Sequence, residues 1–194
     1  EISACLVGSE MCIRDRECLI ENVYVSGTVS GIQQVGGIGG IFAKGTVRNC
    51  YADVKVIGSS RAGGIVAEPR NAVVVENCFA TGTLYSTGNA GGIAGGLNGN
   101  NPTIKGCIAW NEQIDGEPVS GRVIGWQSNT YTKATDCYAK KDMIIAWGPN
   151  KGMTGTDANT AGTYDWGNNK TAICHGITTE NSVDAAKKLS LIHI

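Results

Sequence analysis

One short phrase that returns at a nearly fixed period constrains the fold of this chain more than any other feature. The phrase has four positions: a turn-forming or polar residue, a cysteine or valine, an aromatic or apolar residue, and a small apolar residue. It occurs at residues 22–25, 49–52, 77–80, 106–109 and 136–139. The phrase advances by 27, 28, 29 and 30 residues, and a Gly-Gly-Ile element or its variant falls between copies. A period in this range predicts stacked repeat units rather than a single globular core.

The alternation of residue types within one copy predicts a β-strand. In the third copy Cys78, Ala80 and Leu84 share one face, whereas Phe79 and Thr81 share the other. The cysteine-bearing set is small and apolar, so we expect it to face inward. The residue before the cysteine position is Asn, Asn, Asn, Gly and Asp in the five copies, which are the types that tolerate positive φ. We therefore expect a left-handed corner there, with Asn22, Asn49 and Asn77 in an amide ladder.

These patterns predict an all-β chain, a parallel β-helix (solenoid) with coils of about 28 residues. Each coil is expected to hold at least two strands, and up to three, separated by loops such as residues 68–71 and 98–102. A propeller blade needs roughly 40 residues, and a leucine-rich repeat needs its leucine pattern. The glycine-rich element supplies a second inward column, made of Ile38, Ile65, Ile93 and Val123.

The regular spacing of the cysteines favours a buried column of free thiols, formed by Cys50, Cys78, Cys107 and Cys137. In-register neighbours would lie about 4.8 Å apart, which suits disulfide geometry poorly, and Val23 fills the same place in the first copy. A disulfide framework or a metal site remains the alternative, although no C-x2-C pair is present. No cofactor is expected.

The two ends of the chain resemble translated sequencing adapters, which places residues 1–16 and 189–194 outside the genuine protein. Of the 17 acidic and 16 basic residues, three acidic and two basic ones lie in these ends, which leaves fourteen of each sign. A neutral balance without a basic run argues against a nucleic-acid partner. No stretch approaches the roughly 20 apolar residues of a membrane helix, so no membrane insertion is expected.

An aromatic column is the outer feature most able to bind a partner. It consists of Tyr24, Tyr51, Phe79, Ile108 and Tyr138. Packing between coils would by itself explain such a column. A second interpretation is a stripe that stacks on sugar rings or accepts an apolar edge of another protein, and a third is a column covered by loops of the same chain.

A catalytic centre is not expected, because hydrolase or lyase chemistry needs paired carboxylates, or carboxylates with Lys or Arg, on one face. We expect the outward charged candidates to be scattered over a single coil: Asp53, Lys55, Arg61, Glu68 and Arg70. His175 has no evident nucleophile partner, since the adjacent Cys174 would point the opposite way in a strand.

The copies across residues 20–146 resemble the glycine-rich GLUG repeat of surface and secreted proteins of gut Bacteroidales, which also occurs beside some bacterial immunoglobulin A peptidases. This resemblance implies a right-handed β-helix in an extracellular, adhesin-like protein. The fourth copy departs from the pattern, since it has Arg122 in place of a glycine, adds Trp110 and Trp126, and places Asn111 where the inward pattern is lost.

Residues 17–146 are therefore predicted to form the solenoid and residues 147–188 an irregular C-terminal cap. A short helix over residues 183–188, capped by Asn181 or Ser182, is expected within that cap. The expected function is a non-catalytic adhesion module on an exported bacterial surface protein, with a glycan or host surface protein as partner. The alternatives are an accessory domain of a large extracellular peptidase or polysaccharide-degrading enzyme, and a purely structural stalk.

Overall fold

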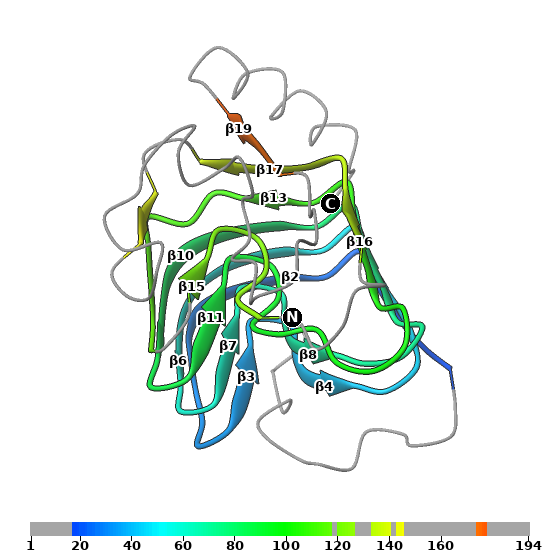
Figure 1. Cartoon of the computed structure of the whole chain (residues 1–194), viewed down its shortest axis with the longest axis horizontal. Helices are drawn as coiled ribbons and strands as arrows, with labels where there is room; N and C mark the ends of the chain where they lie inside the picture. Colours follow the sequence, from blue (N-terminus) through cyan, green and yellow to red (C-terminus); the bar gives the residue numbers. More distant parts are fainter. Residues whose placement is uncertain (1–16, 118–119, 127–132, 141–142, 146–173, 178–194) are drawn as a thin grey trace.

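The protein is a parallel β-solenoid of about four turns (Figure 1). The computed structural model describes residues 17–117, 120–126, 133–140, 143–145 and 174–177. All named strand pairs within this part are parallel, and they join each coil to the next one along the stack. The prediction of an all-β parallel solenoid is confirmed. The helix expected over residues 183–188 lies outside the described residues.

Each coil contributes one strand, or a broken strand, to each of several sheets that run along the stack. Sheet A follows the order β1 (Cys18–Glu21), β5 (Gly45–Arg48), β9 (Val74–Glu76), β12 (Thr103–Lys105) and β16 (Lys133–Thr135). Sheet C follows the order β3 (Gln34–Gly36), β7 (Arg61–Gly63), β11 (Asn89–Gly91) and β15 (Ser120–Gly121).

Sheet B is the broadest and contains the repeated cysteine–aromatic phrase. Its members are β2 (Tyr24–Ser30), β6 (Tyr51–Gly58), β10 (Phe79–Ser86), β13 (Ile108–Ala109), β14 (Gln113–Gly116), β17 (Cys137–Lys140), β18 (Ile144–Ile145) and β19 (Cys174–Ile177). In the fourth coil the strand is split into β13 and β14, because between these two strands that coil has one more residue than the corresponding part of β10 in the third coil. The extra residue lies in the stretch that contains Trp110 and Asn111, as in a β-bulge.

A fourth sheet shows that the expected number of strands per coil was too low. Sheet D pairs β4 (Gly39–Phe42) with β8 (Val66–Pro69), and isolated bridges continue it to Ala94 and Ile124. The first two coils thus have four strands each. Glu68 and Pro69, which were predicted to lie in a loop, are in β8. The pattern missed this strand because glycine, glutamate and proline are depleted in strands generally.

The corners between sheets A and B have the left-handed backbone that the sequence indicates. The φ angles of Asn22, Asn49, Asn77 and Asp136 are 57°, 53°, 52° and 51°, and that of Gly106 is 60°. Asn49 Nδ2 also donates to Asn22 Oδ1 at 3.4 Å, which forms one rung of the expected amide ladder. A sharp corner before β2, β6, β10, β13 and β17 therefore keeps the five copies in register.

The interior consists of small side chains in columns, and the inward cysteines are among the most buried residues. Cys50, Cys78, Cys107 and Cys137 are free thiols with at most 1 % exposure. Each Sγ–H donates to the carbonyl two residues earlier, at 3.1 to 3.3 Å. That carbonyl also accepts a backbone N–H from the preceding coil in each case, so the thiol uses its second lone pair. The second inward column, Ile38, Ile65, Ile93 and Val123, is buried as well.

One strand of the predicted cap continues the solenoid instead of leaving it. β19 pairs with β17 in parallel, so that Cys174 lies beside Cys137 and His175 beside Tyr138 in backbone register. Residues 173–176 read Ile-Cys-His-Gly, a degenerate copy of the repeated phrase. Its distance of 37 residues from Cys137 hides it from a search at a period of about 28. Among the described residues, no helix is long and apolar enough to cross a membrane.

Candidate functional site

The aromatic column on the outer face of sheet B is a stack of rings. The ring centroids of Tyr24 and Tyr51 are 5.0 Å apart with planes at 30°, and those of Tyr51 and Phe79 are 5.0 Å apart at 25°. Strand register brings the rings together, because Tyr51 is paired with Tyr24 on one side and Phe79 on the other. Both faces of the Tyr51 ring are therefore occupied by neighbouring rings, whereas Tyr24, which is 51 % exposed, has a neighbour on one face among the described residues.

The column is shorter as a binding surface than the sequence suggests. Ile108 continues it in register above Phe79, but only 5 % of Ile108 is exposed. The expectation that Ile108 contributes to an outer stripe was wrong, because its side chain has no surface to offer a ligand. Tyr138 follows in register and is half-buried. The continuous accessible part of the column is thus Tyr24, Tyr51 and Phe79, and buried Ile108 separates it from Tyr138.

Polar side chains flank the ring stack on the same face. Thr81 Oγ1 donates to Asp53 Oδ1 at 2.6 Å, and the Tyr51 hydroxyl lies 3.5 Å from the same Thr81 oxygen. Lys55 is exposed one position further along the face. Because the ring faces pack on one another, a ligand here would meet ring edges, hydroxyls and one carboxylate.

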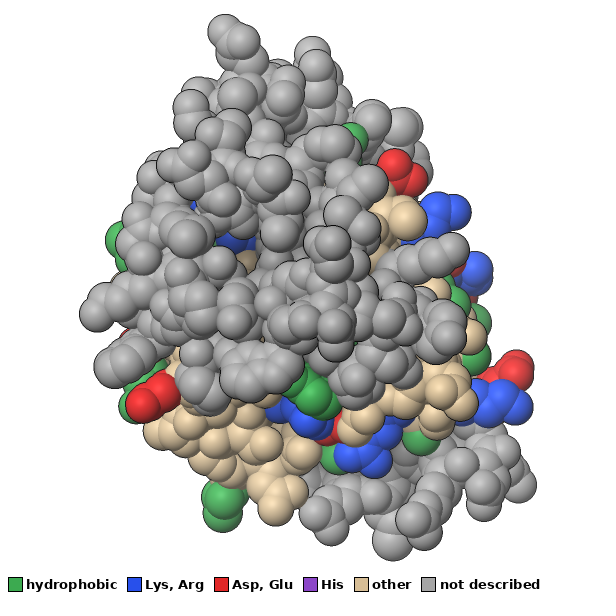
Figure 2. All heavy atoms as spheres, in the orientation of Figure 1, with side chains coloured by type: hydrophobic (Ala, Val, Ile, Leu, Met, Phe, Trp, Pro, Cys, Tyr) green, Lys and Arg blue, Asp and Glu red, His purple; other side chains and the backbone are tan. Residues whose placement is uncertain are grey.

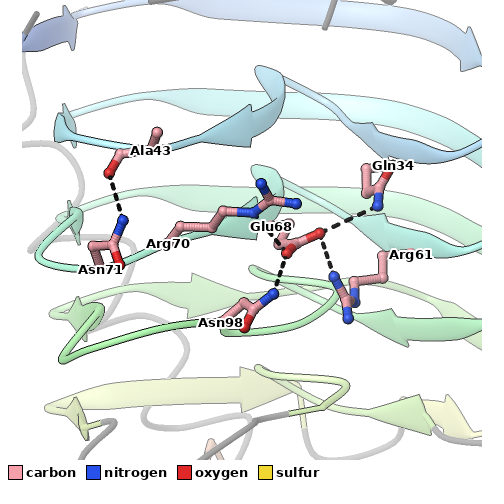
Figure 3. A network of polar contacts seen from close by, with 7 residues as sticks. All are labelled: Gln34, Ala43, Arg61, Glu68, Arg70, Asn71 and Asn98. Carbon is pink, nitrogen blue, oxygen red and sulfur yellow. Dashed lines mark hydrogen bonds and ion pairs between the residues drawn. The ribbon is translucent and has the colours of Figure 1, made fainter. Parts of the chain in front are cut away.

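A second polar cluster, which we call the Glu68 clamp, lies between sheets C and D (Figure 3). The side chain of Glu68 is fully buried, and its two carboxylate oxygens receive two N–H donors each. Oε1 accepts from Arg70 Nε at 2.8 Å and from Asn98 Nδ2 at 2.7 Å. Oε2 accepts from Gln34 Nε2 at 3.2 Å and forms an ion pair with Arg61 Nη1. The clamp joins three successive coils, since Gln34 comes from the first and Asn98 from the third.

The Glu68 clamp holds its carboxylate in the ionised form. Burial alone raises the pKa of Glu68, but hydrogen bonds from Arg70 and Asn98 and the charge of Arg61 outweigh it, so the pKa lies below its usual value. With four donors on its two oxygens the carboxylate has no lone pair left for a substrate proton. Glu68 is therefore a poor candidate for a general acid, a general base or a nucleophile.

The clamp corrects the expectation that the outward charges are scattered. Arg61, Glu68 and Arg70 meet in one cluster, whereas Asp53 and Lys55 lie on sheet B away from it. Sequence reasoning missed the cluster because it treated Glu68 as part of a loop. The signal was present in the register of sheet C, where Arg61 takes the place that Gln34 has in the preceding coil, two residues before the glycine pair. Figure 2 likewise shows basic and acidic side chains next to one another in the lower half of the described surface.

Three residues of the divergent fourth copy bear on the clamp and the core beside it. The guanidinium carbon of Arg61 lies 4.8 Å from the ring centroid of Trp126, in a cation–π contact. Gly96 allows this approach, because a Cβ atom there would lie 2.9 Å from Arg61 Cδ. Asn111 is fully buried in the core and donates to the Thr81 carbonyl at 3.2 Å, and Arg122 is buried as well. Within the described residues, no group of three or more His, Cys, Asp or Glu side chains is arranged to hold a metal ion.

Comparisons with known proteins support the fold. No family model matches this chain, and no curated protein matches it. A solved structure from Bacteroides ovatus, described as a putative immunoglobulin A1 protease, superposes with a TM-score of 0.66 and 23% sequence identity. The match covers 89% of this chain and 55% of that structure. This chain thus spans about half the length of that protein and is similar to it in fold.

Proposed function

We propose that this chain is a non-catalytic binding module of an exported bacterial surface protein, with a glycan or a host surface protein as its partner. The observation that carries the proposal is the column of exposed Tyr24 and half-buried Tyr51 and Phe79, beside the hydroxyl and carboxylate groups of Thr81 and Asp53. Tyrosine combines an apolar ring with a polar hydroxyl, and aromatic residues are enriched at surfaces that bind partners. The resemblance to GLUG-type repeats supports an extracellular location.

The state of the Glu68 clamp supports a role without catalysis. It is the cluster in the described residues that most resembles a catalytic constellation, yet it contains one carboxylate, fully engaged by four donors. Hydrolysis of a glycosidic bond by the usual route requires a second carboxyl group within roughly 10 Å, with one of the two free to donate a proton.

A binding screen with matched variants tests the proposal. The chain is applied to an array of glycans and to immobilised host glycoproteins, and the same measurement is repeated with the double variant Tyr51→Ser/Phe79→Ser. The control is Glu21→Gln/Arg48→Gln, which removes an exposed ion pair from sheet A. We expect the sheet B variant to lose binding at least tenfold and the control to keep it. Equal binding by both folded variants would rule out the aromatic column as the binding surface, and the absence of any ligand would favour the structural stalk.

The second candidate is an accessory domain of a large extracellular peptidase or polysaccharide-degrading enzyme. The observation that favours it is the similarity to about half of a structure described as a putative immunoglobulin A1 protease. The complete gene separates the two proposals. A peptidase or glycosidase motif in the same reading frame supports the accessory domain, whereas an anchoring or fimbrial domain without one supports the adhesion module.

A further inference from the structure

The first coil of the solenoid ends the stack with an open edge. Among the described residues, β1, β2, β3 and β4 each pair on one side only, with the second coil. Edge strands of native sheets are usually protected by proline, by charged residues or by a covering segment. β2 reads Tyr-Val-Ser-Gly-Thr-Val-Ser, seven residues without proline or charge. β2 therefore has the sequence of a strand that is paired on both sides, although it lies at the edge of the described sheet.

The inward side chains of this coil are left partly exposed. Val25 and Val29 continue the columns of Ala52 and Val56, which are fully buried one coil further on. Among the described residues, no layer covers the apolar core at this edge. Leaving such surface in water forgoes the burial that stabilises every other coil.

The glycines with positive φ show in which direction the missing neighbour lies. A Cβ atom added at four of them would first meet the preceding coil: Cys18 for Gly45, Val54 for Gly82, Asn71 for Gly99 and Asn77 for Gly106. Gly27 also has positive φ, 112°, but its added Cβ would meet nothing within 4 Å. Gly27 is therefore open on the side where Gly82 meets the backbone of the preceding coil, at Val54.

Two outer features at the same edge point to the same kind of neighbour. One face of the Tyr24 ring carries the ring stack, and the other has no ring on it among the described residues. Asn22 Oδ1 accepts a hydrogen bond from Asn49 Nδ2, and Asn22 is the first residue of that amide ladder among the described residues. Both would be completed by a coil that presents an aromatic residue over Tyr24 and a corner residue over Asn22.

We propose that this edge binds a further coil of the same repeat type, parallel and in register, supplied by the protein's own polypeptide N-terminal to residue 17. The proposed interface is continuous with the one that joins all the described coils. A second copy of the chain fits less well, because twofold symmetry would pair two β2 strands antiparallel and would not extend the ring stack or the amide ladder.

The intact gene gives the first test. Its translation upstream of residue 17 is expected to contain Asn, Asp or Gly about 27–30 residues before Asn22, followed two positions later by an aromatic or large apolar residue. An upstream segment without this phrase within two periods would overturn the proposal.

A pair of glycine variants gives a second, physical test. Gly27→Ala is compared with Gly82→Ala in the present chain and in the protein extended by its native upstream residues. In the present chain Gly27→Ala suffers only from positive-φ strain, so its loss in Tm is the smaller one. In the extended protein the two losses should become similar, and the β2 amides should gain protection from hydrogen exchange. An unchanged Gly27→Ala loss, or dimers of the present chain that protect β2, would contradict the proposal.

Discussion

Replacing Glu68 by glutamine should destabilise the solenoid far more than its conservative chemistry suggests. The carboxylate is buried and surrounded by donors from Gln34, Arg61, Arg70 and Asn98. A glutamine offers one acceptor oxygen, so its amide nitrogen would face two donors. The positive charges of the two arginines would also lose their counter-ion.

The magnitude follows from the exposure of the two arginines. Removing one partner of a fully buried ion pair costs roughly 3–5 kcal/mol. Arg70 is 39% exposed and can regain water, whereas Arg61 is 17% exposed and lies against Trp126. We therefore expect about 3 kcal/mol for Glu68→Gln, at the lower end of that range. For a chain of this size the loss corresponds to roughly 6–12 °C in Tm.

The assay is urea and thermal unfolding followed by far-UV circular dichroism, with Glu21→Gln as the matched control. Glu21 forms an ion pair with Arg48, but both side chains are more than one-third exposed, so the same substitution should cost less than about 1 kcal/mol. Equal losses for the two variants would refute the reasoning, since they would show that burial of the Glu68 clamp adds nothing.

The pH dependence of stability tests the same ion-pair cluster independently. The pKa of Glu68 is lowered in the folded state, so its contribution is present above the unfolded value of about 4.3 and is lost as pH falls through the lower, folded pKa. The difference in unfolding free energy between the wild type and Glu68→Gln should therefore be constant near neutral pH and shrink below about pH 4. A difference that grows on acidification would contradict the assignment.

Three further predictions concern the repeated positions. Gly64→Ala should lower the free energy of unfolding in urea by at least about 2 kcal/mol, because its Cβ would collide with the Gly92 carbonyl and lie 2.7 Å from the Ala80 Cβ. A loss below about 0.5 kcal/mol, as is usual for surface positions, would contradict this. Asn77→Ala should cost about 1 kcal/mol through its positive φ, while Asn77→Gly stays near neutral; equal losses would exclude the corner explanation. Pulsed alkylation with mass spectrometry should label half-buried Cys18 before the column and spare the column until unfolding, because the reagent cannot reach thiols that are at most 1 % exposed. The protected set is Cys50, Cys78, Cys107 and Cys137.

The sequence was sufficient to predict the repeating part of the fold, because each repeated position has one local requirement. Positive φ selects Asn, Asp or Gly at the corner, and strand alternation selects small apolar residues inward. Sheet D was missed since its strands follow glycine turns and contain Glu68 and Pro69, which local preference assigns to loops. The hydrogen bond of each thiol to the carbonyl two residues earlier was likewise invisible, because it depends on the geometry of the corner.

The candidate sites were predicted less well because they depend on what lies in the neighbouring coil. The ring stack follows from register, but the burial of Ile108 does not, since Ile108 occupies the same strand position as the half-buried Phe79. The Glu68 clamp requires that the outer faces of sheets C and D approach each other, and no repeat period contains that information. Glu68 thus reads as solvent-facing in the sequence and is fully buried in the structure.

The Glu68 clamp differs from the rest of the solenoid in that it is not repeated, and this bears on how the stack chooses its register. The inward columns are nearly identical from coil to coil, so a slip by one whole coil would change their packing little. Glu68 is paired with Ile41 in the preceding coil, and its partners Gln34 and Asn98 come from coils on opposite sides. A slipped stack would keep Arg61 and Arg70, which belong to the same coil as Glu68, but would remove the amide donors of Gln34 and Asn98 from the buried carboxylate. Each hydrogen bond lost from a charged group costs roughly 1.5–3 kcal/mol. The clamp therefore makes one alignment of the coils distinct from the others, which the repeated columns alone do not.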